Sequence, residues 1–78
     1  MNIPSAERER LLRKLTAEEG FASEQDMLEE AMMDSVCPGI CLKCETTTTE
    51  TEPDQTQGWC EHCDEQAVVS CLIIKGLI

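Results

Sequence analysis

The chain has 78 residues and a formal net charge of −10, with one Phe, one Trp and no Tyr. This length supports a single small domain, and so few aromatic side chains leave little apolar area for its core. We therefore expect a cross-link or a bound metal to complete the fold. The charge argues against nucleic-acid binding, which depends on cationic contacts with phosphate, and suits either solubility alone or a basic protein partner.

No apolar run approaches the ~20 residues that a membrane-spanning helix requires. The first residues lead into a charged stretch, Glu7 to Arg10, with neither the apolar core nor the cleavage site of a secretory signal peptide. We therefore expect a cytoplasmic protein, where thiols stay reduced. In that compartment, Cys-x-x-Cys pairs among the six cysteines are expected to hold metal rather than form disulfides.

Residues 5–19 are predicted to form the first helix. Pro4 and Ser5 are typical of a helix start, and Gly20 is a natural C-cap. Charged residues are expected to cover the solvated face. The apolar stripe is predicted at Leu11, Leu12 and Leu15.

Residues 24–35 are predicted to form the second helix, with Ser23 as its N-cap and acidic residues in its first turn. Phe21 is expected to fill the space where the two helices meet, which makes an αα-hairpin of this half. The apolar stripe and its flanks are predicted at Leu28, Ala31, Met32, Met27 and Val36. Thioethers can adapt to many binding surfaces, but in a chain so poor in aromatic residues we interpret three of them as core filling: Met27, Met32 and Met33.

The composition changes near residue 36, where cysteines, threonines and turn residues replace the helix formers. Thr46–Thr51 is β-prone and polar on both faces, so we predict an exposed strand that forms one arm of a hairpin. A turn is predicted between this strand and Trp59, with Asp54 accepting hydrogen bonds within it. Its turn-forming residues are Pro53, Asp54, Gln55 and Gly58.

The last stretch, residues 67–78, fits two structures. Its branched residues favour a strand, whereas Asp64 could cap a helix that ends at Lys75 and Gly76. We favour the helix. Its apolar side chains are expected to cover the helical hairpin or to form a homodimer contact, and they are Leu72, Ile73, Ile74, Leu77 and Ile78.

Two Cys-x-x-Cys pairs, Cys41 with Cys44 and Cys60 with Cys63, are separated by fifteen residues, 45–59. Each such turn directs two sulfurs to one point, and the spacer is long enough to run out and return, so the pattern predicts one tetrahedral zinc ion per chain. Four thiolates leave no open coordination position. We therefore predict a structural site, with no catalytic residue and no other cofactor.

Other ligands and metals fit parts of this pattern. His62 lies inside the second pair, where the turn would direct its ring away from the metal, so we interpret it as a surface imidazole. Rubredoxin-type iron uses the same two turns, but rubredoxins have an aromatic core and a glycine after each pair, where this chain has Glu45 and Asp64. Cys71 is interpreted as a spare thiol in the core, and Cys37 as a spare thiol near the junction of the two halves.

A longer pattern surrounds the cysteine pairs and covers about half of the chain. It consists of Pro38-Gly39-Ile40-Cys41, Cys44, Thr47-Thr48, Glu52-Pro53-Asp54-Gln55, Gly58-Trp59-Cys60-Glu61, Cys63, Val69-Ser70 and Gly76-Leu77-Ile78. This pattern resembles a group of small zinc-ribbon-like proteins of bacteria and phages that has no established activity. The resemblance implies that the paired cysteines are metal ligands and that Cys37 and Cys71 lie where the group tolerates Ser or Ala. Asp64 stands where many proteins of this group have Gly, so the second turn is expected to differ somewhat from theirs.

Together these observations predict a small α+β metal-stabilised domain. Residues 1–36 form a helical hairpin, and residues 37–78 form a zinc-ribbon or treble-clef-like β-hairpin followed by an apolar helix or strand. We expect a non-catalytic structural-zinc protein that acts as a protein-interaction adaptor. The alternatives are a nucleic-acid-associated zinc-ribbon regulator, by analogy of fold, and a rubredoxin-like redox or metal-handling protein.

Overall fold

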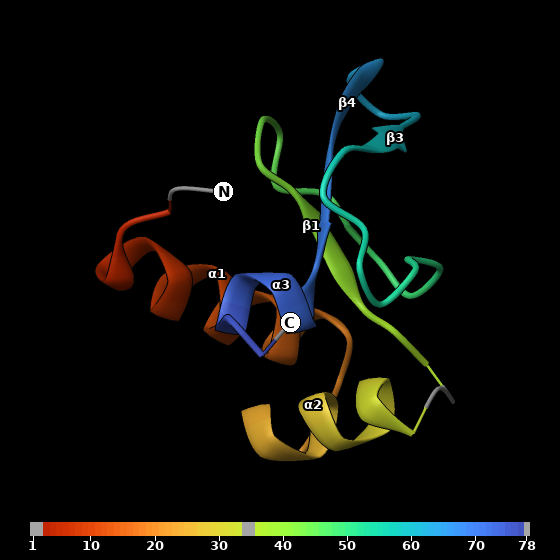
Figure 1. Ribbon diagram of the computed structural model, residues 1–78. Helices are drawn as coiled ribbons and strands as arrows, with labels where there is room; N and C mark the ends of the chain where they lie inside the picture. The colour runs from red at the N-terminus through yellow and green to blue at the C-terminus, as the bar shows by residue number, and fades with distance from the viewer. Residues whose placement is uncertain (1–2, 34–35, 78) are drawn as a thin grey trace.

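The chain folds into helices that lie on one side of a curled, four-stranded antiparallel sheet, which gives an α+β architecture (Figure 1). The computed structural model describes residues 3–33 and 36–77. In chain order the elements are α1 (Ser5–Glu18), α2 (Glu24–Met32), β1 (Gly39–Cys41), β2 (Thr47–Thr48), β3 (Gly58–Cys60), β4 (Glu65–Ser70) and α3 (Cys71–Lys75).

The first two helices begin where the sequence predicts. Helix α1 follows Pro4 and stops before Gly20, whose φ of +77° ends the helix in a left-handed conformation. Helix α2 is capped by Ser23, whose hydroxyl accepts a hydrogen bond of 3.1 Å from the Asp26 amide. Helix α2 ends at Met32, and residues 34 and 35 of the predicted helix lie outside the described part of the chain.

The methionines do not all fill the core, so that interpretation was wrong for two of them. Met27 is fully buried, but Met32 is 66% exposed and Met33 is 75% exposed. The buried stripe of α2 runs through Met27, Leu28 and Ala31. Met32 is four residues after Leu28 and therefore lies at the edge of the buried stripe, in the last turn of α2, where its side chain is exposed.

The sheet has the strand order β2-β1-β4-β3, and this order corrects the predicted hairpin. The threonine strand pairs with β1, Ile40 facing Thr47, while β3 pairs with β4. The strand is also shorter than predicted, covering Thr47–Thr48, and Thr51 beyond it is buried with its hydroxyl donating to the Cys37 carbonyl. The chain reverses at each cysteine pair, so each pair forms the turn of its own hairpin.

Gln55, not Asp54, organises the segment between β2 and β3 in the described structure. The Gln55 amide donates to the Glu52 carbonyl, and the Glu52 amide donates to Gln55 Oε1, both at 3.0 Å. The Gln55 carbonyl accepts from the Ser70 amide, also at 3.0 Å. This segment is therefore held against the end of β4.

The C-terminal stretch contains both a strand and a helix. Val68 and Val69 belong to β4, and helix α3 begins only at Cys71, so the predicted helix from Asp64 was too long. Ser70 caps α3 in place of Asp64: its hydroxyl accepts from the Ile73 amide at 3.3 Å. Gly76 ends α3 with a φ of +85°, as the sequence suggested.

One main core joins the helices to one face of the sheet. Leucines of α1 and the buried stripe of α2 pack with α3 and with Ile40 and Val69, which face each other on β1 and β4. Cys71 is buried in this core, as predicted, and Cys37, which was predicted to lie near the junction of the two halves, is buried in it as well. Cys41 and Val68, the next cross-strand pair, face a second and smaller buried cluster with Cys60. This alternation places the paired cysteines on the sheet face that is turned away from the main core.

Candidate metal centre

The four paired cysteines lie together in a cluster that could hold a metal ion. The sulfurs of Cys41, Cys44, Cys60 and Cys63 all lie within 4.8 Å of one another. Two of the separations, Cys41 to Cys63 and Cys44 to Cys60, are 3.6 Å. A tetrahedron with metal–sulfur bonds of about 2.3 Å has edges of about 3.8 Å, so these distances fit four thiolates around one ion. They are far too long for disulfides, whose sulfurs lie about 2.05 Å apart.

Two matching backbone turns bring the sulfurs together. In the first, the Glu45 amide donates to the Cys41 carbonyl, and in the second the Asp64 amide donates to the Cys60 carbonyl, both at 2.8 Å. Glu45 and Asp64 have φ values of +62° and +57°. This is the left-handed backbone conformation, which residues other than glycine rarely adopt. Asp64 therefore adopts the same turn conformation as Glu45, although the proteins that the sequence resembles commonly have glycine at this position.

Backbone donors also surround the first sulfur. The amides of Lys43 and Cys44 donate to Cys41 Sγ at 3.4 and 3.5 Å. Such hydrogen bonds stabilise a thiolate more than a thiol, because they place positive dipoles next to the charged form. The first turn thus directs two backbone donors at this sulfur.

Two thiols of the cluster, those of Cys44 and Cys63, have pKa values shifted in opposite directions. Hydrogen bonding by Thr46, whose hydroxyl lies 3.1 Å from Cys44 Sγ, lowers the pKa of Cys44 to about 5. Burial raises the pKa of Cys63 to about 12. Four thiols this close resist full ionisation because like charges raise one another's pKa. A bound cation would supply the missing positive charge and hold all four as thiolates, so the donor set fits a metal ion.

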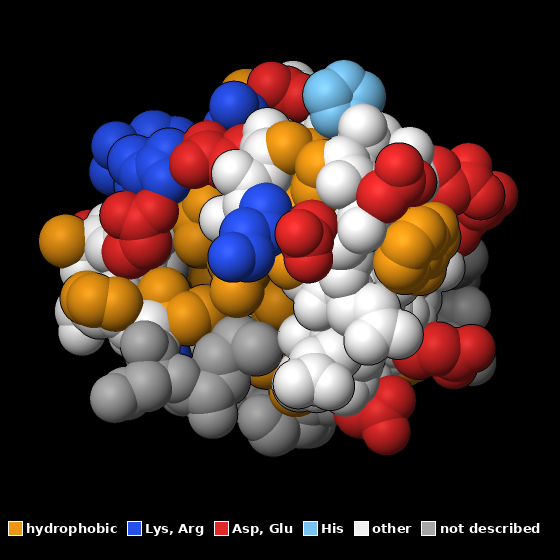
Figure 2. Space-filling model, turned by 90° about the horizontal axis from the view of Figure 1, so that it is seen from above, with side chains coloured by type: hydrophobic (Ala, Val, Ile, Leu, Met, Phe, Trp, Pro, Cys, Tyr) orange, Lys and Arg blue, Asp and Glu red, His pale blue; other side chains and the backbone are white. Residues whose placement is uncertain are grey.

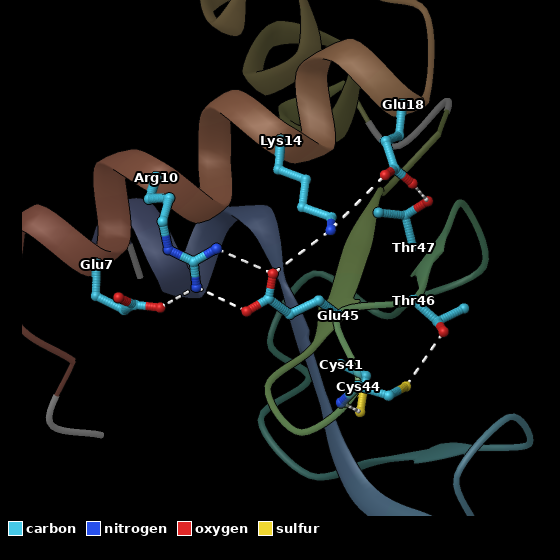
Figure 3. A network of polar contacts seen from close by, with 9 residues as sticks. All are labelled: Glu7, Arg10, Lys14, Glu18, Cys41, Cys44, Glu45, Thr46 and Thr47. Carbon is cyan, nitrogen blue, oxygen red and sulfur yellow. Dashed lines mark hydrogen bonds and ion pairs between the residues drawn. The ribbon is translucent and has the colours of Figure 1, made fainter.

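A network of charged side chains connects the first cysteine turn to helix α1 (Figure 3). Arg10 donates two hydrogen bonds to the Glu45 carboxylate, at 2.9 and 2.7 Å, and also pairs with Glu7. Lys14 lies 3.5 Å from the same carboxylate. The Arg10 guanidinium holds the pKa of Glu45 well below its ordinary value, at about 2. Glu45, which has the left-handed conformation in the first turn, is therefore held in place by two cations of α1.

Sequence reasoning missed this network. Arg10 and Lys14 were expected only to cover the solvated face of the first helix, and Glu45 was noted only as a departure from glycine. Arg10 and Glu45 are 35 residues apart, and nothing in the local pattern pairs them. Their contact depends on how α1 packs against the sheet.

The remaining candidate ligands lie elsewhere. His62 is exposed, in agreement with a surface imidazole, and it is not among the four clustered ligands of the described chain. Cys37 and Cys71 are buried in the main core instead. Burial and the nearby Cys37 thiol raise the pKa of Cys71 to about 12, so Cys71 is protonated and behaves as a small apolar side chain.

Comparisons with protein-family models, with curated proteins and with solved structures find no match to this chain. The resemblance to small zinc-ribbon-like proteins therefore stays an expectation. Among the described residues, no helix combines the length and the apolar character needed to cross a membrane.

Proposed function

We propose that the protein is a small zinc-ribbon-like module in which one zinc ion, held by Cys41, Cys44, Cys60 and Cys63, stabilises the fold. The observation that carries this proposal is the clustering of the four sulfurs within 4.8 Å, with two separations of 3.6 Å. Structural zinc in such sites supplies about 10–16 kcal/mol of apparent binding free energy. This is as large as the net stability that a core this small and this poor in aromatic residues leaves after the cost in chain entropy.

Zinc is preferred to iron because of what surrounds the sulfurs. A site of four thiolates accepts either metal. The aromatic core and paired glycines typical of rubredoxin-type iron proteins are missing, and Glu45 and Asp64 occupy the glycine positions. A closed site with four protein ligands leaves no position for substrate, so the role assigned to the metal is structural.

For this non-enzymatic module we propose a role as a cytoplasmic adaptor that binds another protein. The sequence carries a net charge of −10, and within the described residues Arg10 and Lys14 pair with Glu45, and Lys75 pairs with Glu24. On the face seen in Figure 2, acidic side chains are spread over the left, the centre and the right, and the Lys and Arg side chains on the left and in the centre lie beside acidic ones. Such a surface suits a basic protein partner better than nucleic acid.

Metal analysis of the purified chain tests the zinc assignment. Native mass spectrometry is expected to show one zinc ion per chain, and the solution is expected to be colourless. Bound iron would give visible charge-transfer absorption, and either iron or a metal-free protein with intact disulfides would contradict the proposal.

Single Cys→Ser variants test which thiols hold the ion. Cys41→Ser and Cys60→Ser are expected to lose stoichiometric zinc and the folded circular-dichroism spectrum, because each removes one of four ligands. Cys37→Ser is the matched control, since it changes a buried thiol outside the cluster. It is expected to retain one zinc ion per chain, and loss of zinc from this variant would contradict the ligand set.

A further inference from the structure

A hollow of about 460 Å³ lies beside the cysteine cluster. Its lining includes Val68 and Cys60, which belong to the small buried cluster around the thiols. Val69, the next residue of β4, packs in the main core with the helices. Because side chains alternate along a strand, the hollow opens on the sheet face that the helices leave uncovered.

Trp59, the only tryptophan of the chain, forms one wall of this hollow and is 57% exposed. It lies on β3 at the edge of the sheet, and the register with β4 shifts between Gly58 and Trp59. Such irregularities bend a strand and redirect the side chain next to them. A large aromatic face held partly in water contributes little to folding, but tryptophan dominates many binding interfaces.

The hollow has the charge pattern of a site for a cation. Glu50 and Glu61 line it together with Trp59 and His62, and the described residues contribute no Lys or Arg to its lining. The π face of tryptophan attracts cations, and a guanidinium can stack on it while donating paired hydrogen bonds to carboxylates. The proposed zinc ion and its four thiolates would together have a net charge of −2. One of these thiolates, Cys60, forms part of the lining of the hollow.

We propose that this hollow binds an arginine side chain from an extended basic segment of a partner protein, with the guanidinium stacked on Trp59 and its donors directed to Glu50 and Glu61. The edge position of β3 supports an extended partner, because the outer side of an edge strand offers backbone groups that a peptide can pair with. The inference rests on the proposed adaptor function and specifies its partner class.

Because Trp59 is the only tryptophan, its fluorescence reports directly on the hollow. The zinc-loaded chain is titrated with acetyl-Gly-Arg-Gly-Arg-Gly-Arg-amide, and a saturable change in Trp59 emission is expected that weakens as salt is raised. The same peptide with Gln in place of Arg is expected to give no saturable change. A Lys version is expected to bind more weakly, since ammonium groups neither stack nor pair in a bidentate manner.

Calorimetry on variants separates the contribution of the hollow to peptide binding from the contribution of the overall charge. The double variant E50Q/E61Q is expected to weaken Arg-peptide binding about fivefold or more, and W59L to weaken it about fivefold while W59F retains most of it. The matched control is E29Q/E30Q, which removes the same charge from exposed positions of α2 and is expected to change binding less than about twofold.

Two outcomes would overturn the inference: equal weakening by the two double variants, or no saturable response from a folded chain with one zinc ion. Zinc content and circular dichroism are measured on every sample. A chain that lacks zinc would contradict the proposed metal site instead, so the two failures are distinguishable.

Discussion

Two residues in unusual backbone conformations set the geometry of the cysteine cluster. Glu45 and Asp64 follow the two Cys-x-x-Cys pairs, and both have positive φ values. They are stabilised differently. Arg10 and Lys14 hold the Glu45 carboxylate, whereas Asp64 is exposed, and short Asx side chains adopt this conformation more easily than others. The same turn is therefore supported by tertiary contacts in one case and by residue type in the other.

Asp64→Gly is expected to stabilise the zinc-loaded protein slightly, by up to about 1 kcal/mol, because glycine adopts a positive φ without steric cost and this exceeds its entropy penalty. Chemical denaturation followed by circular dichroism measures the change. Glu45→Gly is the informative comparison, because it relieves the same conformation but loses the contacts with Arg10 and Lys14. Its gain should be smaller or absent. Destabilisation by Asp64→Gly would contradict this account.

At the scale of elements, Ser70 joins the end of β4 and the start of α3 to a distant segment that contains Pro53 and Gln55. Its hydroxyl accepts from the Ile73 amide at the start of α3 and donates to the Pro53 carbonyl at 2.6 Å. Its amide donates to the Gln55 carbonyl. Ser70 is fully buried, so no water can replace these bonds. The abrupt change from strand β4 to helix α3 depends on this one side chain.

Ser70→Ala is expected to lower the free energy of unfolding by about 2 kcal/mol, because it removes a helix cap and leaves the Pro53 carbonyl without its donor. Ser23→Ala is the matched control: it removes the cap of α2 at an exposed position and should cost about 1 kcal/mol or less. Denaturant midpoints of the two variants at equal zinc loading give the comparison. Equal costs would show that the Pro53 contact contributes nothing.

At the scale of the whole molecule, the helices and the cysteine cluster are connected through opposite faces of the same two strands. Ile40 and Val69 belong to the main core, and their neighbours Cys41 and Val68 belong to the cluster around the thiols. Arg10 and Lys14 add a second connection from α1 to the first cysteine turn. Loss of the metal is therefore expected to reach the helices.

Removal of zinc with excess chelator is expected to unfold the sheet and the helices in one transition. Trp59 fluorescence reports on the sheet, and circular dichroism at 222 nm reports on the helices. The two signals should change together and recover together when zinc is restored. A change in Trp59 emission with the helical signal intact would show that the helical half folds without the metal.

The sequence by itself determined the features that depend on local spacing. Helix starts at Ser5 and Glu24 followed from capping residues and apolar periodicity, and the four clustered cysteines followed from the two Cys-x-x-Cys pairs. These predictions succeeded because capping and two-residue cysteine turns depend on a few neighbouring residues. They needed no knowledge of how distant segments pack.

Only the tertiary structure decided which segments meet. The contact of Arg10 with Glu45 depends on the packing of α1 against the sheet, and the exposure of Met32 depends on how α2 packs against α1 and α3. The threonine strand pairs with β1 across the first cysteine turn, one of several pairings open to so short a strand. The strand-to-helix change at Ser70 likewise depends on partners fifteen or more residues away, at Pro53 and Gln55. Short β-prone or apolar runs fit several pairings equally well in sequence, and long-range hydrogen bonds and burial select one of them.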